Sequence, residues 1–142
     1  MFKGFEEQEG TPRDVRRFER LWLLAMVSSV IVAIGMYDYS IAIVGPFVAA
    51  LVNIVLFGFA AILMLYASRR CSNVARLMLP VFFLLILAYD IAHYTEMMDR
   101  NVTAYLMMGR LGLMAAAIYF LFTPASRSWF AGRPVSDEDV ED

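Results

Sequence analysis

The sequence predicts an all-α polytopic membrane protein, a four-helix transmembrane bundle of two antiparallel hairpins. Three observations predict this fold. Hydrophobic residues make up 61% of the 142 residues, more apolar surface than a small soluble domain can bury. They are concentrated in four continuous runs, and a membrane-spanning helix needs about 20 apolar residues. Lysine and arginine lie almost entirely on one side of those runs. The runs cover residues 21–37, 43–67, 77–95 and 102–122.

The distribution of basic residues predicts the orientation of the bundle. Basic residues are enriched in cytoplasmic segments of membrane proteins. Here they precede the first run, fill the second connection and follow the fourth run, whereas the other two connections contain Arg100 alone. Both termini and the middle loop are therefore predicted to be cytoplasmic. The basic residues on the predicted cytoplasmic side are Lys3, Arg13, Arg16, Arg17, Arg20, Arg69, Arg70, Arg76, Arg127 and Arg133.

Three segments are expected along the chain. Residues 1–19 form a cytoplasmic segment with an interfacial helix start, in which Thr11 is the predicted N-cap and Pro12 the first helical residue. Residues 20–122 form the transmembrane domain, with spans at about 20–40, 43–67, 76–97 and 102–122. Residues 123–142 form a cytoplasmic amphipathic anchor and a disordered acidic tail. A cleavable signal peptide is not expected, and the single Cys71 excludes an intramolecular disulfide.

Arginine and tryptophan side chains next to the spans are predicted to anchor the protein at the membrane interface. Cationic side chains bind lipid headgroups, and tryptophan is enriched at the interface. A specific lipid-recognition role is an alternative for the arginines before the first span. The predicted anchors are Arg16, Arg17, Arg20, Trp22, Arg127 and Trp129.

Small residues recur every fourth position on the first two spans, as Ala25, Ser29 and Ala33 and as Gly45, Ala49 and Asn53. Small residues let helix backbones approach closely in lipid. We therefore expect these two faces to pack on each other, with Asn53 hydrogen-bonded to Ser28 or Ser29. Gly109, Gly112 and Ala116 are expected to form a separate packing face on the fourth span.

The third and fourth spans carry ionisable residues, Asp90, His93 and Arg110. A charged residue near the centre of a bilayer costs about 2.5–3.5 kcal/mol on insertion scales. At 1.5 Å per residue, Asp90 lies roughly 20 Å and Arg110 roughly 18 Å from the cytoplasmic edge. These matching depths predict an Asp90–Arg110 ion pair. With Glu96, the three residues form a predicted polar cluster near the periplasmic surface.

Several roles for this cluster remain open. Buried carboxylates and a histidine can relay protons in a transporter. His93 and Met97 are weak candidates for Cu(I) ligands, and one histidine permits only His/Met or shared haem ligation. The simplest interpretation is an interhelical clasp. No nucleophile–base arrangement is evident, so we expect no enzyme activity, no bound cofactor and no metal site.

Three short motifs resemble a group of small, uncharacterised bacterial inner-membrane proteins with four predicted spans. They are an RRFE-like entry within residues 16–21, a basic, serine-containing loop at 67–76, and a closing FTPxxRxWF element within 121–130. The resemblance implies a bacterial cytoplasmic membrane and no established activity.

Two main functions are therefore expected as alternatives. The first is a small accessory or scaffold protein that associates with a larger membrane complex, or with itself, in the lipid bilayer. The second is a minimal transporter or a proton- or ion-linked sensor that uses the Asp90, His93 and Arg110 cluster. A redox or haem-binding membrane subunit is a third. No nucleic-acid partner is expected.

Overall fold

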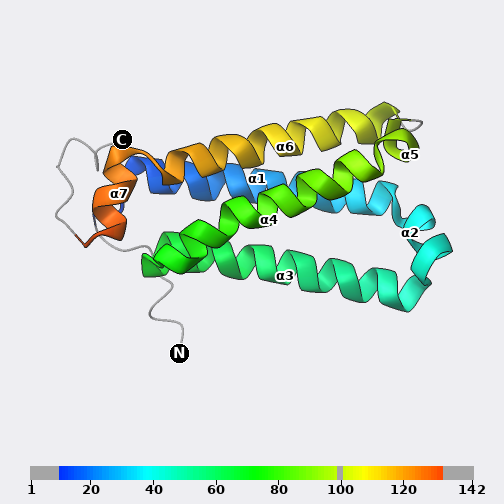
Figure 1. Ribbon diagram of the computed structural model, residues 1–142, viewed down its shortest axis with the longest axis horizontal. Coiled ribbons are helices and arrows are strands. Elements are labelled where there is room, and N and C mark those ends of the chain that lie inside the picture. The colour runs from blue at the N-terminus through cyan, green and yellow to red at the C-terminus, as the bar shows by residue number, and fades with distance from the viewer. Residues whose placement is uncertain (1–9, 99–100, 133–142) are drawn as a thin grey trace.

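The computed structural model describes residues 10–98 and 101–132, and this part of the chain is helical apart from short connections (Figure 1). Four of its helices are long and apolar enough to cross a membrane. They are α1 (Arg13–Gly35), α3 (Pro46–Arg70), α4 (Asn73–Ala92) and α6 (Asn101–Leu121). The shorter helices are α2 (Tyr37–Val44), α5 (Tyr94–Met98) and α7 (Pro124–Phe130).

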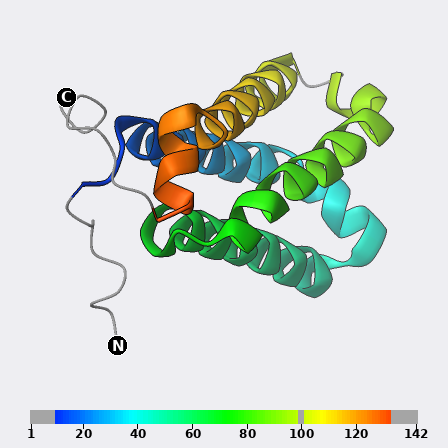
Figure 2. The same cartoon turned by 60° about the vertical axis from the view of Figure 1, so that its left-hand side comes forward.

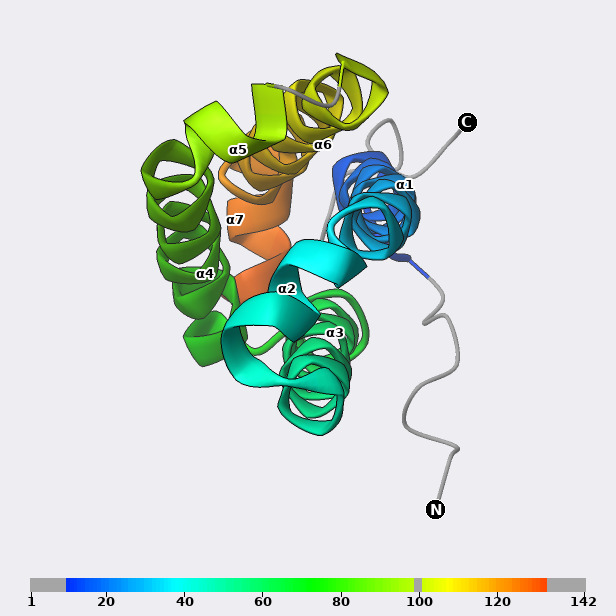
Figure 3. The same cartoon turned by 90° about the vertical axis from the view of Figure 1, so that its right-hand side faces the viewer.

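The four long helices lie side by side, with α2 and α5 at one end of the bundle and α7 at the other (Figure 1). Viewed along the bundle, α1 lies next to α3 and α6, and α4 lies next to the same two helices (Figure 3). The most extensive packing joins α1 to α6, the first and last long helices. A Cβ atom added to Gly35 would lie 3.0 Å from Thr103 Oγ1. This glycine therefore permits a close approach of α1 to α6.

The main core lies in the half of the bundle nearer α7. Phe18, Trp22, Leu79 and Leu121 are fully buried there. The Trp22 ring centroid lies 5.9 Å from that of Phe18 and 6.3 Å from that of Phe82. The prediction of Trp22 as an interfacial anchor is therefore wrong. Trp22 lies on the side of α1 that carries the buried apolar residues of this helix. Its indole therefore packs into the core shared with α3, α4 and α6.

The start of α1 also differs from its prediction. Pro12 is the N-cap, Arg13 is the first helical residue, and no side chain caps the helix. The Pro12 carbonyl instead accepts hydrogen bonds from the backbone N–H groups of Val15 and Arg16. Helix α4 is capped by Ser72, whose hydroxyl oxygen accepts from the Ala75 N–H at 3.3 Å.

Two span boundaries differ from the sequence prediction. The link between the first two spans forms α2, whose C-cap is Gly45 with a positive φ of 80°. The predicted third span, 76–97, is interrupted at His93, where α4 ends and α5 follows. Pro80 lies inside α4.

Gly109 and Gly112 do not form a packing face within the described bundle. Both are exposed, and a Cβ atom added to either would meet nothing within 4 Å. The close helix contact that the sequence assigned to this face is made at Gly35 instead. The open glycine face, Gly109 and Gly112, is thus turned away from α1 and α4.

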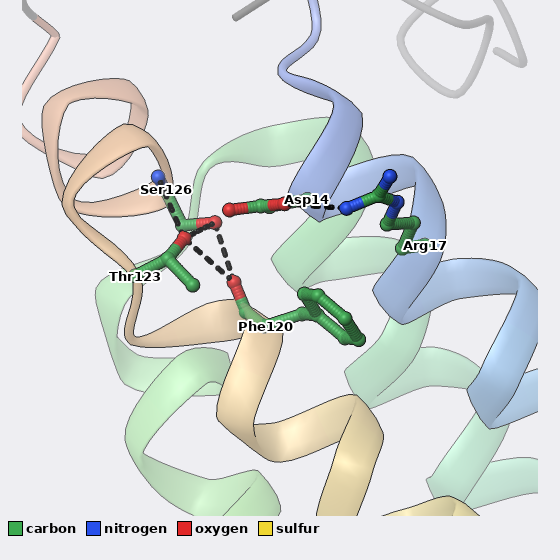
Figure 4. A network of polar contacts seen from close by, with 5 residues as sticks. All are labelled: Asp14, Arg17, Phe120, Thr123 and Ser126. Atoms are coloured by element: carbon green, nitrogen blue, oxygen red, sulfur yellow. Dashed lines mark hydrogen bonds and ion pairs between the residues drawn. The ribbon is translucent and has the colours of Figure 1, made fainter. Parts of the chain in front are cut away.

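Helix α7 turns across the end of the bundle at which α1 begins (Figure 2). The fourth long helix ends at Leu121, before Pro124, and Thr123 caps α7 by accepting from the Ser126 N–H at 3.4 Å. The Ser126 hydroxyl donates to the Phe120 carbonyl at 2.6 Å, and the Thr123 hydroxyl lies beside both (Figure 4). These bonds fix the angle between α6 and α7.

An arginine between two aromatic rings secures α7 against the bundle. The guanidinium carbon of Arg76 lies 4.5 Å from the ring centroid of Phe122 and 4.9 Å from that of Phe130. The Asn73 amide donates to the Phe130 carbonyl at 3.2 Å. Helix α7 therefore docks on the start of α4, and the acidic tail predicted for 133–142 lies outside the described residues.

Candidate functional site

Asp90 on α4 and Arg110 on α6 form an ion pair between Asp90 Oδ1 and an Arg110 guanidinium nitrogen. The Asp90 residue is 1% exposed and Arg110 is 8% exposed. The pairing predicted from their matching depths is thus present. Asp90 Oδ2 and Arg110 Nε have no hydrogen-bond partner among the described residues. Within the described chain, one acceptor of the pair, Asp90 Oδ2, and one donor, Arg110 Nε, therefore remain without a hydrogen bond.

His93 lies at the break between α4 and α5, with its ring held by two tyrosines. The ring stacks on Tyr89 with centroids 4.3 Å apart, and Tyr39 of α2 meets it edge-on at 6.1 Å. His93 Nδ1 lies 3.0 Å from the Tyr89 carbonyl oxygen. A carbonyl only accepts hydrogen bonds, so Nδ1 carries the proton in the neutral ring. Nε2 is then the ring nitrogen that can accept a hydrogen bond.

Between the helices lies a cavity of about 610 Å³, reached by side chains from α1, α2, α3, α4 and α6. Its wall is mainly apolar, with Met36, Phe57 and Ile86 among its residues. Arg110 and His93 also line it. The cavity therefore adjoins the ion pair on one side and the histidine at the α2 end. The sequence analysis did not predict this space.

The cavity also explains why a predicted hydrogen bond is not formed. Asn53 donates to the Ala49 carbonyl of its own helix at 2.8 Å, and Ser29 donates to the Ala25 carbonyl at 2.7 Å. Both residues line the cavity, whereas Ser28 does not. The space between α1 and α3 separates Asn53 from Ser29, so each polar side chain is satisfied within its own helix.

One residue of the predicted cluster, Glu96, and the candidate copper ligand Met97 cannot be placed with the others. The side chains of Glu96 and Met97, both on α5, lie outside the part of the chain whose side chains are described. Among the residues that are described, no group of three or more His, Cys, Asp or Glu side chains could hold a metal ion. The structure thus pairs Asp90 with Arg110, and it places Arg110 and His93 on the cavity wall.

The predicted anchors also lie in different environments. Arg16, Arg17 and Arg20 lie on the outer side of α1, and Arg127 is exposed on α7. Trp129 is half-buried beside Cys71. Only some of these side chains are therefore free to meet lipid headgroups.

The cavity has the size and the lining of a ligand pocket. Ligand pockets commonly enclose about 300–1,000 Å³ and are mainly apolar with a few polar groups. The polar residues of its wall include Arg110, His93, Tyr39, Ser40, Asn53 and Ser29. The signal that sequence reasoning missed was the pair of polar residues, Ser29 and Asn53, which lie within the apolar runs of α1 and α3 and both line the cavity.

The fold and this site were compared with known proteins. No protein-family model matches the chain, and no match was found among curated proteins or solved structures.

Proposed function

We propose that this protein binds a small membrane-soluble molecule in the cavity between its long helices, as a ligand-linked sensor or minimal transporter. The main support for this function is the apolar cavity of about 610 Å³, whose wall includes Arg110 and His93. In this proposal both termini and the α3–α4 loop face the cytoplasm of a bacterial inner membrane, and the helices form two antiparallel hairpins.

An apolar occupant is favoured because the cavity wall offers little to a hydrated solute. Removing apolar surface from contact with water or filling an empty apolar space is favourable. A polar end of the same molecule can reach the Arg110 guanidinium or His93 Nε2. The ion pair then has two roles, to join α4 to α6 and to form one wall of the site.

His93 adds a hydrogen-bond acceptor to the site. With Nδ1 donating to the Tyr89 carbonyl, Nε2 of the neutral ring can accept a hydrogen bond from the occupant. The Asp90–Arg110 pair supplies the charged groups of the site. We therefore propose that the occupant lies with its polar end toward His93 and Arg110, both of which line the cavity.

The test is recovery of a bound molecule from protein purified in mild detergent, measured by native mass spectrometry. Ala33 lines the cavity and is half-buried. The Ala33→Phe variant should fill part of the space and lose the bound mass. Ala115→Phe is the matched control, since Ala115 is exposed and lies outside the cavity lining. Equal recovery of a bound molecule from both variants, or from neither variant nor the parent protein, would contradict the proposal.

An accessory or scaffold function is the second candidate. The open glycine face, Gly109 and Gly112, favours it, because small residues that are exposed in a span permit close approach of another helix. We propose that its occupant is a helix of a larger membrane complex. Replacing both glycines with leucine should release the protein from that complex during purification. Recovery of the parent protein as a monomer or as a homodimer would count against the proposal.

A further inference from the structure

Four arginines at the start of α1 lie on a single side of the helix. After Arg13, the other three follow at three, four and seven residues, as Arg16, Arg17 and Arg20. This spacing places all four on one helical face. Together they line a surface hollow of about 150 Å³. The opposite side of α1 is locked in the core, because Val15, Phe18 and Trp22 are all 0% exposed. The arginine face therefore cannot rotate away.

Two acidic side chains on the same turns of α1 have ion-pair partners. Asp14 lies 3.6 Å from Arg17 of the hollow, whereas Glu19 pairs with Arg69 of α3 at 2.7 Å. No carboxylate is among the residues that line the hollow. Like charges at this helical spacing repel one another. The Arg17 guanidinium also lies 5.7 Å from the Phe120 ring centroid, which helps to hold it in place (Figure 4).

We propose that this arginine hollow, formed by Arg13, Arg16, Arg17 and Arg20, binds one phosphate group. An arginine guanidinium presents parallel N–H donors that match two phosphate oxygens, and several such forks around one point neutralise a phosphate. The hollow lies directly before the apolar part of α1, which begins at Leu21. In a bilayer this is the level of the lipid headgroups. The phosphate is that of an anionic phospholipid or a free phosphate.

This site is independent of the cavity. Its lining residues belong to α1 before Leu21, whereas the α1 residues that line the cavity begin at Trp22. A general attraction of the membrane for basic residues predicts a response to total charge. A defined phosphate site predicts one bound group for each chain and a dependence on which arginines are present.

The test is native mass spectrometry of the full chain taken from vesicles of phosphatidylcholine alone or of phosphatidylcholine with phosphatidylglycerol. One phosphatidylglycerol should be retained per chain. The Arg16→Gln/Arg20→Gln variant should weaken retention by about tenfold, on the scale of charge-assisted hydrogen bonds. The control is Arg70→Gln/Arg127→Gln, which removes the same charge at exposed positions outside the hollow and should change retention by less than about twofold.

Three further measurements complete the test. Adding inorganic phosphate to the detergent-solubilised protein distinguishes the sources: displacement of the lipid identifies a site for phosphate itself, and no displacement identifies the whole lipid headgroup. Arg20→Lys keeps the charge but removes the guanidinium fork, and it should weaken retention by a few fold. Circular dichroism melting shows that each variant is folded. Equal loss in the two double variants, or retention of several lipids without a preferred stoichiometry, would overturn the proposal.

Discussion

Asp90 and Arg110 form an ion pair that joins α4 to α6 within the bundle, and Arg110 also lines the cavity. The pair is therefore both a structural link and part of a candidate binding site. In lipid, each partner offsets the cost of burying the other.

Removing either partner should damage the fold more than removing both. Asp90→Leu or Arg110→Leu leaves an uncompensated buried charge and should lower the free energy of unfolding by about 3–5 kcal/mol. The double variant Asp90→Leu/Arg110→Leu should lose less than either single change. Denaturant titration in detergent measures the four states of the cycle. Additive effects of the two substitutions would show that the residues do not interact.

A less deeply buried pair provides a comparison for this cycle. Glu19 and Arg69 lie 2.7 Å apart with side chains 18% and 20% exposed. Because this pair is more accessible to solvent than Asp90 and Arg110, the same double-mutant cycle there should give a smaller coupling energy.

The Gly35–Thr103 contact predicts a position-specific effect of added methyl groups. Gly35→Ala would place Cβ 3.0 Å from Thr103 Oγ1 and should destabilise the bundle by about 1–2 kcal/mol through overpacking. Thr103→Ala in the same chain should remove most of that loss. Gly112→Ala, where the space is open, should be neutral or stabilising by up to about 1 kcal/mol because alanine favours helix. Thermal unfolding in detergent compares the three; equal effects of Gly35→Ala and Gly112→Ala would refute the close contact.

Much of the architecture was predictable from the sequence because length and apolarity alone determine which segments can cross lipid. The Asp90–Arg110 pair was predictable for a related reason, since depth along a helix follows directly from residue number. Which helices pack together was not predictable. Small residues mark helix faces that can approach another helix closely, and Gly35 and Gly112 both lie on such faces. Of these two glycines, however, only Gly35 has a neighbouring side chain within 4 Å of an added Cβ atom.

The cavity and the position of Trp22 were missed for another physical reason. Whether a polar side chain such as Asn53 bonds across a helix pair depends on their separation, and its own helix offers an equally good acceptor. Trp22 begins an apolar run and suits an interface, but the rotation of α1 places it in the core. These features depend on packing between segments that are distant in the chain.

Burial makes Cys71 a weakly acidic thiol. Cys71 lies between α3 and α4, where burial raises the pKa of the thiol and the neighbouring Trp129 indole lowers that pKa by a smaller amount. Alkylation by iodoacetamide should therefore be slow at neutral pH, and its midpoint should lie above that of a thiol in the unfolded chain. Trp129→Phe should move the midpoint to higher pH if the fold is kept.

The same shift contributes to the pH dependence of stability. The folded protein holds the thiol proton to higher pH than the unfolded chain does. This contribution is complete below the unfolded-state pKa and is lost as the pH rises through the folded-state pKa. Cys71→Ala should remove that part of the alkaline loss, as measured by thermal unfolding across this range. A thiol that reacts at the rate of a free cysteine at neutral pH would contradict the burial.

The position of Arg76 between two rings predicts a local effect on α7. Arg76→Met removes both cation–π contacts, with Phe122 and Phe130, and should weaken the docking of α7 by about 1–2 kcal/mol. Hydrogen exchange should then rise in α7 but stay unchanged in α1. Arg70→Met is the control, since Arg70 is exposed and lies over the ring of Tyr66 in its own helix. Unchanged exchange in α7 after Arg76→Met would show that other contacts hold this helix.

If the cavity between the long helices accepts a membrane-soluble molecule, a small apolar photolabel should enter it. An aryl trifluoromethyl diazirine is such a probe, and peptide mass spectrometry maps the positions that it labels. We expect saturable labelling of cavity residues such as Phe57 and Ile86, which Ala33→Phe reduces and Ala115→Phe does not. Labelling confined to lipid-facing residues, rising in proportion to probe concentration and equal in both variants, would contradict binding in the cavity.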